Sequence, residues 1–456
     1  MSSDLHGAQG WAPDSWKQRP ALQMPQYPDP HALEQALARL SQLPPLVTSW
    51  EVLSLKQQLA QAQEGQRFVL QGGDCAENFA DCQSQVISNR LKILLQMSLV
   101  LVHGLRTPVV RIGRMAGQYA KPRSADSETR DGVSLPSYRG DVINAPEFTL
   151  AARQPDPQRM LDAHAHSAMT MNFVRALIDG GFADLNHPEY WDLAWAKKSP
   201  MAARYQQQVD AIRESIRFMQ TLSGAPIHNL NRADFFTSHE ALLLPYEQAL
   251  TRRVPRHDGW FNLSTHFPWI GMRTAALDGA HVEYLRGVVN PIAVKVGPSV
   301  QPDQLLRLID VLNPNDEPGR LTFIHRMGAD VIADRLPPLL RAVQADGRRV
   351  LWLCDAMHGN TESTGNGYKT RRFDNIRREV EQAFALHAAA GTRLGGVHLE
   401  LTGEDVTECM GGARDLTETD LERAYRSTVD PRLNYEQSLE VAMLIVRKQA
   451  TLASCG

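Results

Sequence analysis

The sequence predicts an α/β fold, a (β/α)8 TIM barrel with an N-terminal extension and an inserted helical segment. Short aliphatic or β-branched runs alternate with helical segments from about Arg67 onward. Charged or metal-capable residues follow most of these runs, and in a barrel the residues just past the strand ends share one face. The main alternative, an open doubly wound sheet, would normally carry a Gly-rich first turn, and the sequence has none.

Seven strand candidates and one weaker candidate fit this barrel. The weaker one lies within Asp234–Leu244. The other seven are short apolar runs: Arg67–Gln71, Pro108–Ile112, Trp260–Ser264, Ile292–Val296, Leu321–His325, Val350–Cys354 and Gly396–Leu401.

Helices are expected between and around these strands. Asp374–Ala390 repeats its apolar residues at helical spacing and stops at Gly391, which is a good helix C-terminus. A helix at Leu439–Lys448 is the last predicted element of the chain. Ahead of the first strand, helices are expected at His31–Leu40 and Ser49–Gln63.

Two segments exceed what eight βα units need. Residues 1–66 form an N-terminal extension rich in Pro, Gln and Trp, and residues 67–456 hold the barrel. Within the barrel, a helical insertion near 199–223 carries one apolar stripe, which would pack against the host domain or a neighbouring subunit. We expect both segments to serve an interface or regulation. The simpler alternative is that they only cap the ends of the barrel.

The bulk properties of the 456-residue chain are those of a soluble globular protein, with 43% hydrophobic and 22% charged residues. A formal net charge of -3 argues against a nucleic-acid-binding surface, so any affinity for anions must be local. The apolar stretch around Leu94–Leu105 is interrupted and too short to span a bilayer, and no signal peptide is visible. Five cysteines are few and odd in number, which argues against a disulfide scaffold. We expect a cytoplasmic protein without membrane or nucleic-acid partners.

Basic residues recur just past the predicted strand ends. Arg114, Lys121, Arg123, Lys295 and Arg326 would all lie at the same end of a barrel. Clustering so many cations in a concave site is costly without a counter-charge, because like charges repel strongly there. Arg matches phosphate and carboxylate through paired hydrogen bonds, whereas Lys supplies a compact charge. The cluster therefore predicts strongly anionic, phosphorylated substrates.

Metal-capable residues occur at the same end of the predicted barrel. Cys75 and His358 offer a thiolate and an imidazole, and this pair favours a first-row transition ion over Mg²⁺ or Ca²⁺. Glu400 at a strand end and Asp430 before Pro431 add two carboxylates. The sequence predicts a divalent metal site with room for water or substrate.

Each ligand also has a simpler interpretation. Cys75 could be a small buried residue, as an isolated cysteine after a strand usually is. Glu400 could pair with His398, which shares its strand face, and Asp430 could cap a helix. Cys354 is a rival ligand, although a strand interior suits it better.

Seven longer motifs span nearly the whole chain. They are GGDCAENF (72–79), AGQYAKPRS (116–124), SYRGDVIN (137–144), SHEALLL (238–244), NPIAVKVGP (290–298), CDAMHGNT (354–361) and LTGEDVTEC (401–409). Together they resemble the type II family of 3-deoxy-D-arabino-heptulosonate 7-phosphate (DAHP) synthases, and the similarity runs from about Trp16 to Arg447. The resemblance implies a (β/α)8 barrel that condenses phosphoenolpyruvate with erythrose 4-phosphate and releases phosphate, the first step of the shikimate pathway.

The resemblance also implies residue roles. The metal ligands would be Cys75, His358, Glu400 and Asp430, with Mn²⁺ or Co²⁺ favoured and Fe²⁺, Zn²⁺ or Cd²⁺ as alternatives. The phosphoenolpyruvate pocket would be formed by Arg114, Lys121, Met272, Arg273, Lys295 and Arg326.

Three residues complete the expected catalytic apparatus. Arg123 and Ser124 would face the phosphate group of erythrose 4-phosphate. Lys121 is the candidate for protonating the nascent alkoxide or holding the aldehyde. Met272 departs from the family pattern, because some relatives carry Glu there, and a position that contributes only its backbone N–H would lose nothing.

Two other functions remain open at this point. An octulosonate synthase acting on arabinose 5-phosphate would share the phosphoenolpyruvate pocket, but the Pro122-Arg123 pair favours the shorter sugar. A catalytically silent regulatory subunit would be free to lose the ligands and cations that this chain keeps. Relatives with comparable additions imply a homodimer or homotetramer inhibited by an aromatic amino acid, with tryptophan favoured.

Overall fold

The computed structural model of the chain describes residues 10–180, 182, 203, 206–207, 210–211, 214 and 234–455. The predicted helical insertion near 199–223 lies outside the described residues except for these scattered positions.

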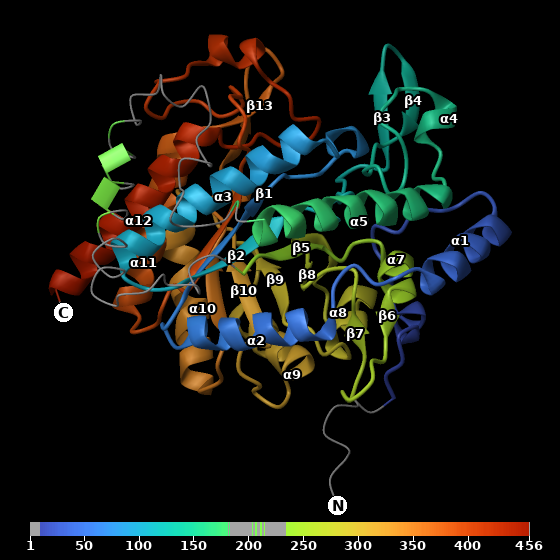
Figure 1. Cartoon of the computed structure of the whole chain (residues 1–456), viewed down its shortest axis with the longest axis horizontal. Helices are drawn as coiled ribbons and strands as arrows, with labels where there is room; N and C mark the ends of the chain where they lie inside the picture. The colour runs from blue at the N-terminus through green and yellow to red at the C-terminus, as the bar shows by residue number, and fades with distance from the viewer. Residues whose placement is uncertain are drawn as a thin grey trace, which may run out of the picture.

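Eight parallel strands close into a barrel, which confirms the predicted fold class (Figure 1). Around the barrel the order is β1-β14-β11-β10-β9-β8-β5-β2. The strands in chain order are β1 (Phe68–Gly73), β2 (Val109–Arg114), β5 (Phe236–Glu240), β8 (Phe267–Ile270), β9 (Ile292–Val296), β10 (Leu321–His325), β11 (Leu351–Cys354) and β14 (Gly396–Glu400). The helices that follow them are α3 (Ser84–Leu105), α5 (Gln158–Asp179), α7 (Leu244–Ala249), α8 (Ala280–Arg286), α9 (Pro302–Leu312), α10 (Ile332–Asp346), α11 (Phe373–Ala389) and α12 (Tyr435–Cys455).

One predicted barrel strand is wrong. Of Trp260–Ser264, only Phe261–Asn262 is a strand (β7), and it pairs antiparallel with β6 (Thr251–Arg252) outside the barrel. The barrel strand is β8, which starts at Phe267. It is four residues long and contains Pro268, which has no N–H for a ladder, so its sequence signal is weak. The weak candidate at residues 234–244 is confirmed as β5.

The helix predictions hold with shifts at the ends. α2 covers Ser49–Gln63 as expected, because Thr48 and Glu51 form a capping box at its start. α1 spans Pro30–Gln42, and α11 is one residue offset from the expected range. The last helix, α12, begins at Tyr435, ahead of its predicted start.

The N-terminal extension supplies part of the barrel's own core. Leu55, Leu59 and Ala62 of α2 are fully buried and belong to the same apolar cluster as the side chains inside the barrel, including Val69 and Leu351 near the strand starts. Each buried leucine contributes roughly 1.5–3 kcal/mol relative to an exposed one. Figure 1 shows α2 crossing the end of the barrel opposite the hairpin of β3 (Ser127–Arg130) and β4 (Val133–Pro136). The capping alternative therefore describes this helix.

The remaining elements are short and lie outside the eight strand–helix units of the barrel. They are η1 (Ser15–Gln18), η2 (Phe79–Asp81), the β3–β4 hairpin (Ser127–Arg130 and Val133–Pro136), α4 (Leu150–Arg153), η6 (Met272–Thr274), η7 (His358–Asn360), the β12–β13 hairpin (Thr361–Ser363 and Lys369–Arg371) and η8 (Glu418–Arg423).

α3 is long and apolar enough to cross a membrane by length and composition, but 67% of its apolar window is buried inside the protein. A buried core helix passes the same test, and α3 packs in the main apolar cluster with α12.

Candidate active site

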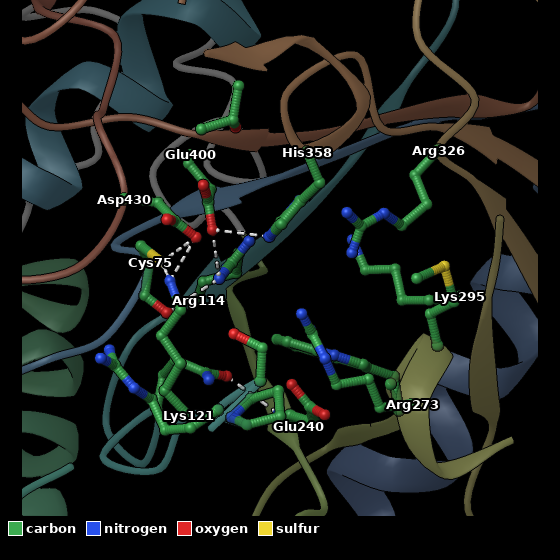
Figure 2. A pocket seen from close by; sticks show the side chains of 18 of the residues that line it. Cys75, Arg114, Lys121, Glu240, Arg273, Lys295, Arg326, His358, Glu400 and Asp430 are labelled. Atoms are coloured by element: carbon green, nitrogen blue, oxygen red, sulfur yellow. Dashed lines mark hydrogen bonds and ion pairs between the residues drawn. The ribbon is translucent and has the colours of Figure 1, made fainter. Parts of the chain in front are cut away.

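A cavity of about 250 Å³ opens where the barrel strands end. All eight barrel strands deliver polar or ionisable side chains to it, either from the strand's last residues or from the loop that follows (Figure 2). All the site residues expected from the sequence line it: Cys75, Arg114, Lys121, Arg123, Ser124, Met272, Arg273, Lys295, Arg326, His358, Glu400 and Asp430. The structure thus brings the predicted residues together, and their individual roles stay predictions.

The loop that carries Lys121 is held through its backbone N–H groups by a buried carboxylate. The Glu77 carboxylate accepts hydrogen bonds from the N–H groups of Ala116, Gly117 and Gln118, at 2.9–3.1 Å. Gly117 has φ +152, and a Cβ there would meet Nδ1 of His239 at 2.4 Å, so only glycine fits. The first motif after β1 therefore fixes the conformation of the second motif after β2.

A group of possible metal ligands occupies one side of the cavity. Cys75, Glu400 and Asp430 place their ligand atoms within 4.8 Å of one another. His358 joins them, with Nε2 at 3.1 Å from Oε1 of Glu400. The rival ligand Cys354 does not line this cavity and instead packs in the layer between strands and helices.

The chemistry of these donors fits a transition-metal ion. Nδ1 of His358 lies 2.7 Å from the Asp355 carboxylate, which fixes the ring and leaves Nε2 facing the other ligands. Burial and the neighbouring Glu400 charge raise the pKa of the Cys75 thiol well above its ordinary value, although Lys121 acts in the opposite direction. A buried thiolate in this position needs a cation beside it, and a divalent ion supplies more charge than an ammonium.

The two carboxylates are ionised, and neither caps a helix. Burial opposes ionisation of Glu400, but the charges of His358, Arg371 and Arg114 hold its pKa well below the ordinary value. Glu400 is indeed an ion-pair partner, but its partners include these two arginines and not His398. The Asp430 carboxylate contacts Lys121 and Lys369.

The opposite side of the cavity is cationic, as Figure 2 shows for Arg273, Lys295 and Arg326. Burial, reinforced by Arg114 and Arg326, lowers the pKa of Lys295 to about 8, although its ion pair with Asp355 opposes this. Arg273 and Arg326 form no ion pair with any residue that the structure describes. Cations that face a cavity without a protein counter-charge are prepared for an anionic ligand.

The expected aldose-phosphate residues lie at the outer edge of the cavity. Arg123 donates to Oε1 of Glu128 at 2.9 Å, so its guanidinium is already paired. Its backbone N–H donates to the Gln23 side chain, which also accepts from Arg139. Ser124 is exposed. A residue of the N-terminal extension thus contacts the active-site loop directly.

Glu240 is a cavity residue that the sequence argument missed. It is the last residue of β5, and burial raises the pKa of its carboxyl, although Lys295, His358 and Arg114 oppose the shift. Its Oε1 is buried without a hydrogen-bond partner among the described residues. A Cβ at Gly271 would meet this oxygen at 2.0 Å, so glycine makes room for it. Glu240 is part of the SHEALLL motif, but β5 was the weakest predicted strand, so the sequence did not indicate that Glu240 lies at a strand end.

Met272 lines the cavity through a thioether. A Cβ on Gly297 would meet Met272 Sδ at 2.2 Å, so the Met272 side chain packs closely against the backbone after β9. No carboxylate from this position faces the substrate side.

Comparisons with known proteins identify the family. The model of the class-II DAHP synthetase family matches residues 11–446. A phospho-2-dehydro-3-deoxyheptonate aldolase from Neurospora crassa is 48% identical, with 96% of this chain and 94% of that protein covered. A protein of the same name from Streptomyces coelicolor is also 48% identical, covering 95% of this chain and 96% of its own length.

A solved structure was also matched, a truncated 3-deoxy-D-arabino-heptulosonate 7-phosphate synthase from Thermotoga maritima. It is 12% identical, covers 86% of this chain and 88% of its own, and has a TM-score of 0.31, which is too low to support a structural argument. The fold rests on the strand pairing itself and the family on the sequence matches. The chain belongs to the class-II DAHP synthetase family.

Proposed function

We propose that the protein is a metal-dependent 3-deoxy-7-phosphoheptulonate synthase, a transferase that condenses phosphoenolpyruvate with D-erythrose 4-phosphate. The products are DAHP and inorganic phosphate, and the reaction is the first step of the shikimate pathway. The observation that supports this most is that one side of the cavity is cationic and the other side carries the possible metal ligands. Arg273 and Arg326, which form no ion pair with a described residue, face a group of thiol, imidazole and carboxylate side chains across the cavity. Family membership points to the same reaction.

Cys75, His358, Glu400 and Asp430 would hold the metal. When bound, a divalent ion at this position supplies Lewis-acid stabilisation of negative charge on the aldehyde oxygen. Mn²⁺ or Co²⁺ fits the mixed donor set, and Fe²⁺, Zn²⁺ or Cd²⁺ remain compatible with it.

The cationic side would bind phosphoenolpyruvate. Arg273, Lys295 and Arg326 can pair with its phosphate and carboxylate and hold C3 toward the aldehyde carbon of erythrose 4-phosphate. Fixing both substrates in one cavity removes much of the entropic barrier to forming the C–C bond. Arg114 stays tied to Glu400 and so joins the two sides.

Glu240 is placed to act on water. One carboxyl oxygen has no hydrogen-bond partner among the described residues, and the pKa of the carboxyl is raised. Both features suit a group that holds a water molecule and accepts its proton as the water oxygen adds to C2. The resulting hemiketal phosphate then loses phosphate by cleavage of the C2–O bond. Lys121 would protonate the alkoxide that forms on the aldose.

A substrate panel tests the function. We expect phosphate release from phosphoenolpyruvate with erythrose 4-phosphate, and much slower release with arabinose 5-phosphate. A chelator should abolish the reaction, and added Mn²⁺ or Co²⁺ should restore it. The product should be identified by mass. Equal or faster turnover of arabinose 5-phosphate would assign the octulosonate reaction instead, and no release with any aldose would leave only the silent-subunit hypothesis.

We further propose feedback inhibition by an aromatic amino acid, with tryptophan favoured, in a cytoplasmic homodimer or homotetramer. A separate cavity of about 910 Å³ lies between the N-terminal extension and the β6–β7 region, lined by Trp16, Leu37 and Trp260. The Gln23 contact gives the extension a direct connection to the Arg123 loop.

The expected result is inhibition by tryptophan, phenylalanine or tyrosine, singly or together, and a solution mass of two or four chains. Gln23→Ala should reduce the inhibition while leaving the mass unchanged, because it removes one contact between extension and loop. Light scattering and initial rates measure the two properties separately. A monomer that responds to none of the three amino acids would contradict the proposal and leave capping as the role of the extension.

A further inference from the structure

The side-chain ammonium of Lys121 lies inside the group of metal ligands. Its Nζ is 2.5 Å from Sγ of Cys75, and it also forms an ion pair with Oδ2 of Asp430. That oxygen is in turn 3.7 Å from the Cys75 sulfur. The Lys121 side chain is only 14% exposed, so the contact is largely shielded from solvent. Figure 2 shows Cys75 and Asp430 converging on this amine.

This arrangement has a clear electrostatic cause. Two carboxylates and a thiol converge within 4.8 Å, and uncompensated negative charge in such a buried group is unfavourable. Lys121 supplies the cation that balances this charge, through its contacts with Cys75 and Asp430. An ammonium donates hydrogen bonds to the same lone pairs that a metal ion would use.

A divalent ion and this ammonium cannot share the position. Bonds from metal to sulfur or to carboxylate oxygen are about 2.0–2.3 Å long, so an ion bound to Cys75 and Asp430 would sit almost on the present position of Nζ. Both are cations, and repulsion at such a distance inside a protein is strong.

We infer that Lys121 is the resident cation of the metal-free site and leaves the ligand group when the metal enters, which releases its amine into the substrate cavity. This inference rests on the metal requirement of the proposed function. It gives Lys121 two alternating positions, one on the ligands and one on the substrate side.

The surroundings allow the side chain to move while the backbone stays. The Lys121 N–H donates to the carbonyl of Arg139 at 2.9 Å, and the loop before it is fixed by Glu77. The flexible stem borders the 250 Å³ cavity, which has room for the released amine. Departure therefore needs rotation about side-chain bonds only.

Lys369 offers a matched control. Its Nζ lies 3.1 Å from Oδ1 of the same Asp430 carboxylate, but the side chain is 50% exposed and does not contact Cys75. Removing either lysine deletes one positive charge near the metal. Only removal of Lys121 empties the ligand position.

The first experiment compares Lys121→Met and Lys369→Met in purified chain stripped of metal, with Co²⁺ affinity measured against a chromophoric chelator and no substrate present. A competitor that occupies the site nine-tenths of the time weakens apparent affinity about tenfold, so Lys121→Met should bind Co²⁺ about tenfold more tightly. Lys369→Met should change the affinity by less than about threefold, as an exposed, screened charge does. Metal-free Lys121→Met should also melt at a lower temperature than the metal-free parent, because it loses its internal cation. Unchanged or weaker Co²⁺ binding by Lys121→Met, or equal tightening in both variants, would overturn the inference.

The second experiment uses the unaltered protein and does not depend on a variant that folds. Lysine acetylation is followed residue by residue by mass spectrometry, before and after loading with Co²⁺, and Lys369 in the same digest gives the reference. The Lys121 labelling rate should rise on loading relative to that of Lys369, because the amine leaves a buried ion pair for an open cavity. A Lys121 rate that stays the same or falls contradicts the release. Neither experiment contains substrate, so a protein that makes no DAHP would refute the proposed function without affecting these results.

Discussion

Replacing Cys75 with serine is expected to remove most of the turnover and to weaken metal binding by at least about 100-fold, which is the upper range for changing a group that only supports a ligand. The thiol is buried at 3% exposure and lies beside Asp430 and near Glu400. A serine hydroxyl is far harder to ionise than a thiol and is a poorer partner for the softer divalent ions. Metal content by elemental analysis and kcat with saturating Mn²⁺ or Co²⁺ measure the two losses.

Cys354→Ser is the matched control for this change. Cys354 is also a fully buried cysteine directly after apolar strand residues, but it lies on the helix side of β11 and outside the cavity. Its replacement should lower thermal stability, since the buried serine hydroxyl must be satisfied beside His325 and Glu379, whose side-chain ligand atoms lie within 4.8 Å of the sulfur. Metal content and kcat should remain near those of the parent. Full activity of Cys75→Ser in metal-free buffer would remove Cys75 from the ligand set.

The sequence was sufficient to place most of the barrel because a strand followed by a charged loop repeats in it. β9 and β10 were predicted at their observed bounds, Ile292–Val296 and Leu321–His325, since each is a mostly aliphatic or aromatic stretch of five residues, all of them buried. β8 was missed because it is only four residues long and contains a proline, so its sequence does not resemble a typical strand. Pro268 is tolerated there by the barrel around it, which is tertiary information.

The site was predictable to the extent that single residue types indicate chemistry. A cysteine, a histidine and a run of Arg and Lys at strand ends point to a metal and an anion without any structure. Arg371 gives no such signal, yet it is fully buried and pairs with Glu400. Glu240 and Arg371 matter through their position relative to other elements, and only the closed barrel defines that position. The role of α2 was likewise hidden, because a helix that fills one end of a barrel looks like any amphipathic helix.

Replacing Arg326 with alanine is expected to lower kcat/KM for phosphoenolpyruvate. The corresponding loss of transition-state stabilisation should be about 2–5 kcal/mol, the usual loss when one partner of a buried charge pair is removed. Arg326 is a cleaner probe than Lys295. Lys295→Ala would leave the Asp355 carboxylate buried without its ion pair, whereas Arg326 has no counter-ion among the described residues. The loss in Arg326→Ala therefore reports on the ligand and not on a disrupted protein network. Unchanged kcat/KM would show that phosphoenolpyruvate binds elsewhere.

The pH dependence gives an independent measure of the same pocket. Lys295, with its pKa lowered to about 8, is charged in the free protein below that pH and loses its charge as the pH rises through it. The KM for phosphoenolpyruvate should therefore rise above about pH 8. Since Arg326 is one of the cations that lower this pKa, Arg326→Ala should move the rise to higher pH. A rise that does not move would mean that another group titrates.

The aldose end should respond differently, and Arg123→Ala is the change that separates the two ends. Arg123 lies at the outer edge of the cavity, 25% exposed, and already pairs with Glu128. Its loss should raise the KM for erythrose 4-phosphate by more than that for phosphoenolpyruvate, because its guanidinium is the cation in the Lys121-Pro122-Arg123-Ser124 loop nearest the expected sugar phosphate. Part of the effect will be offset, since Glu128 also pairs with Arg130 and Arg153 and so keeps a counter-charge. Initial rates with each substrate varied in turn, on Arg123→Ala and Arg326→Ala side by side, measure the contrast. If both variants change the two KM values in the same ratio, the cavity has no separate aldose end at Arg123 and that assignment is wrong.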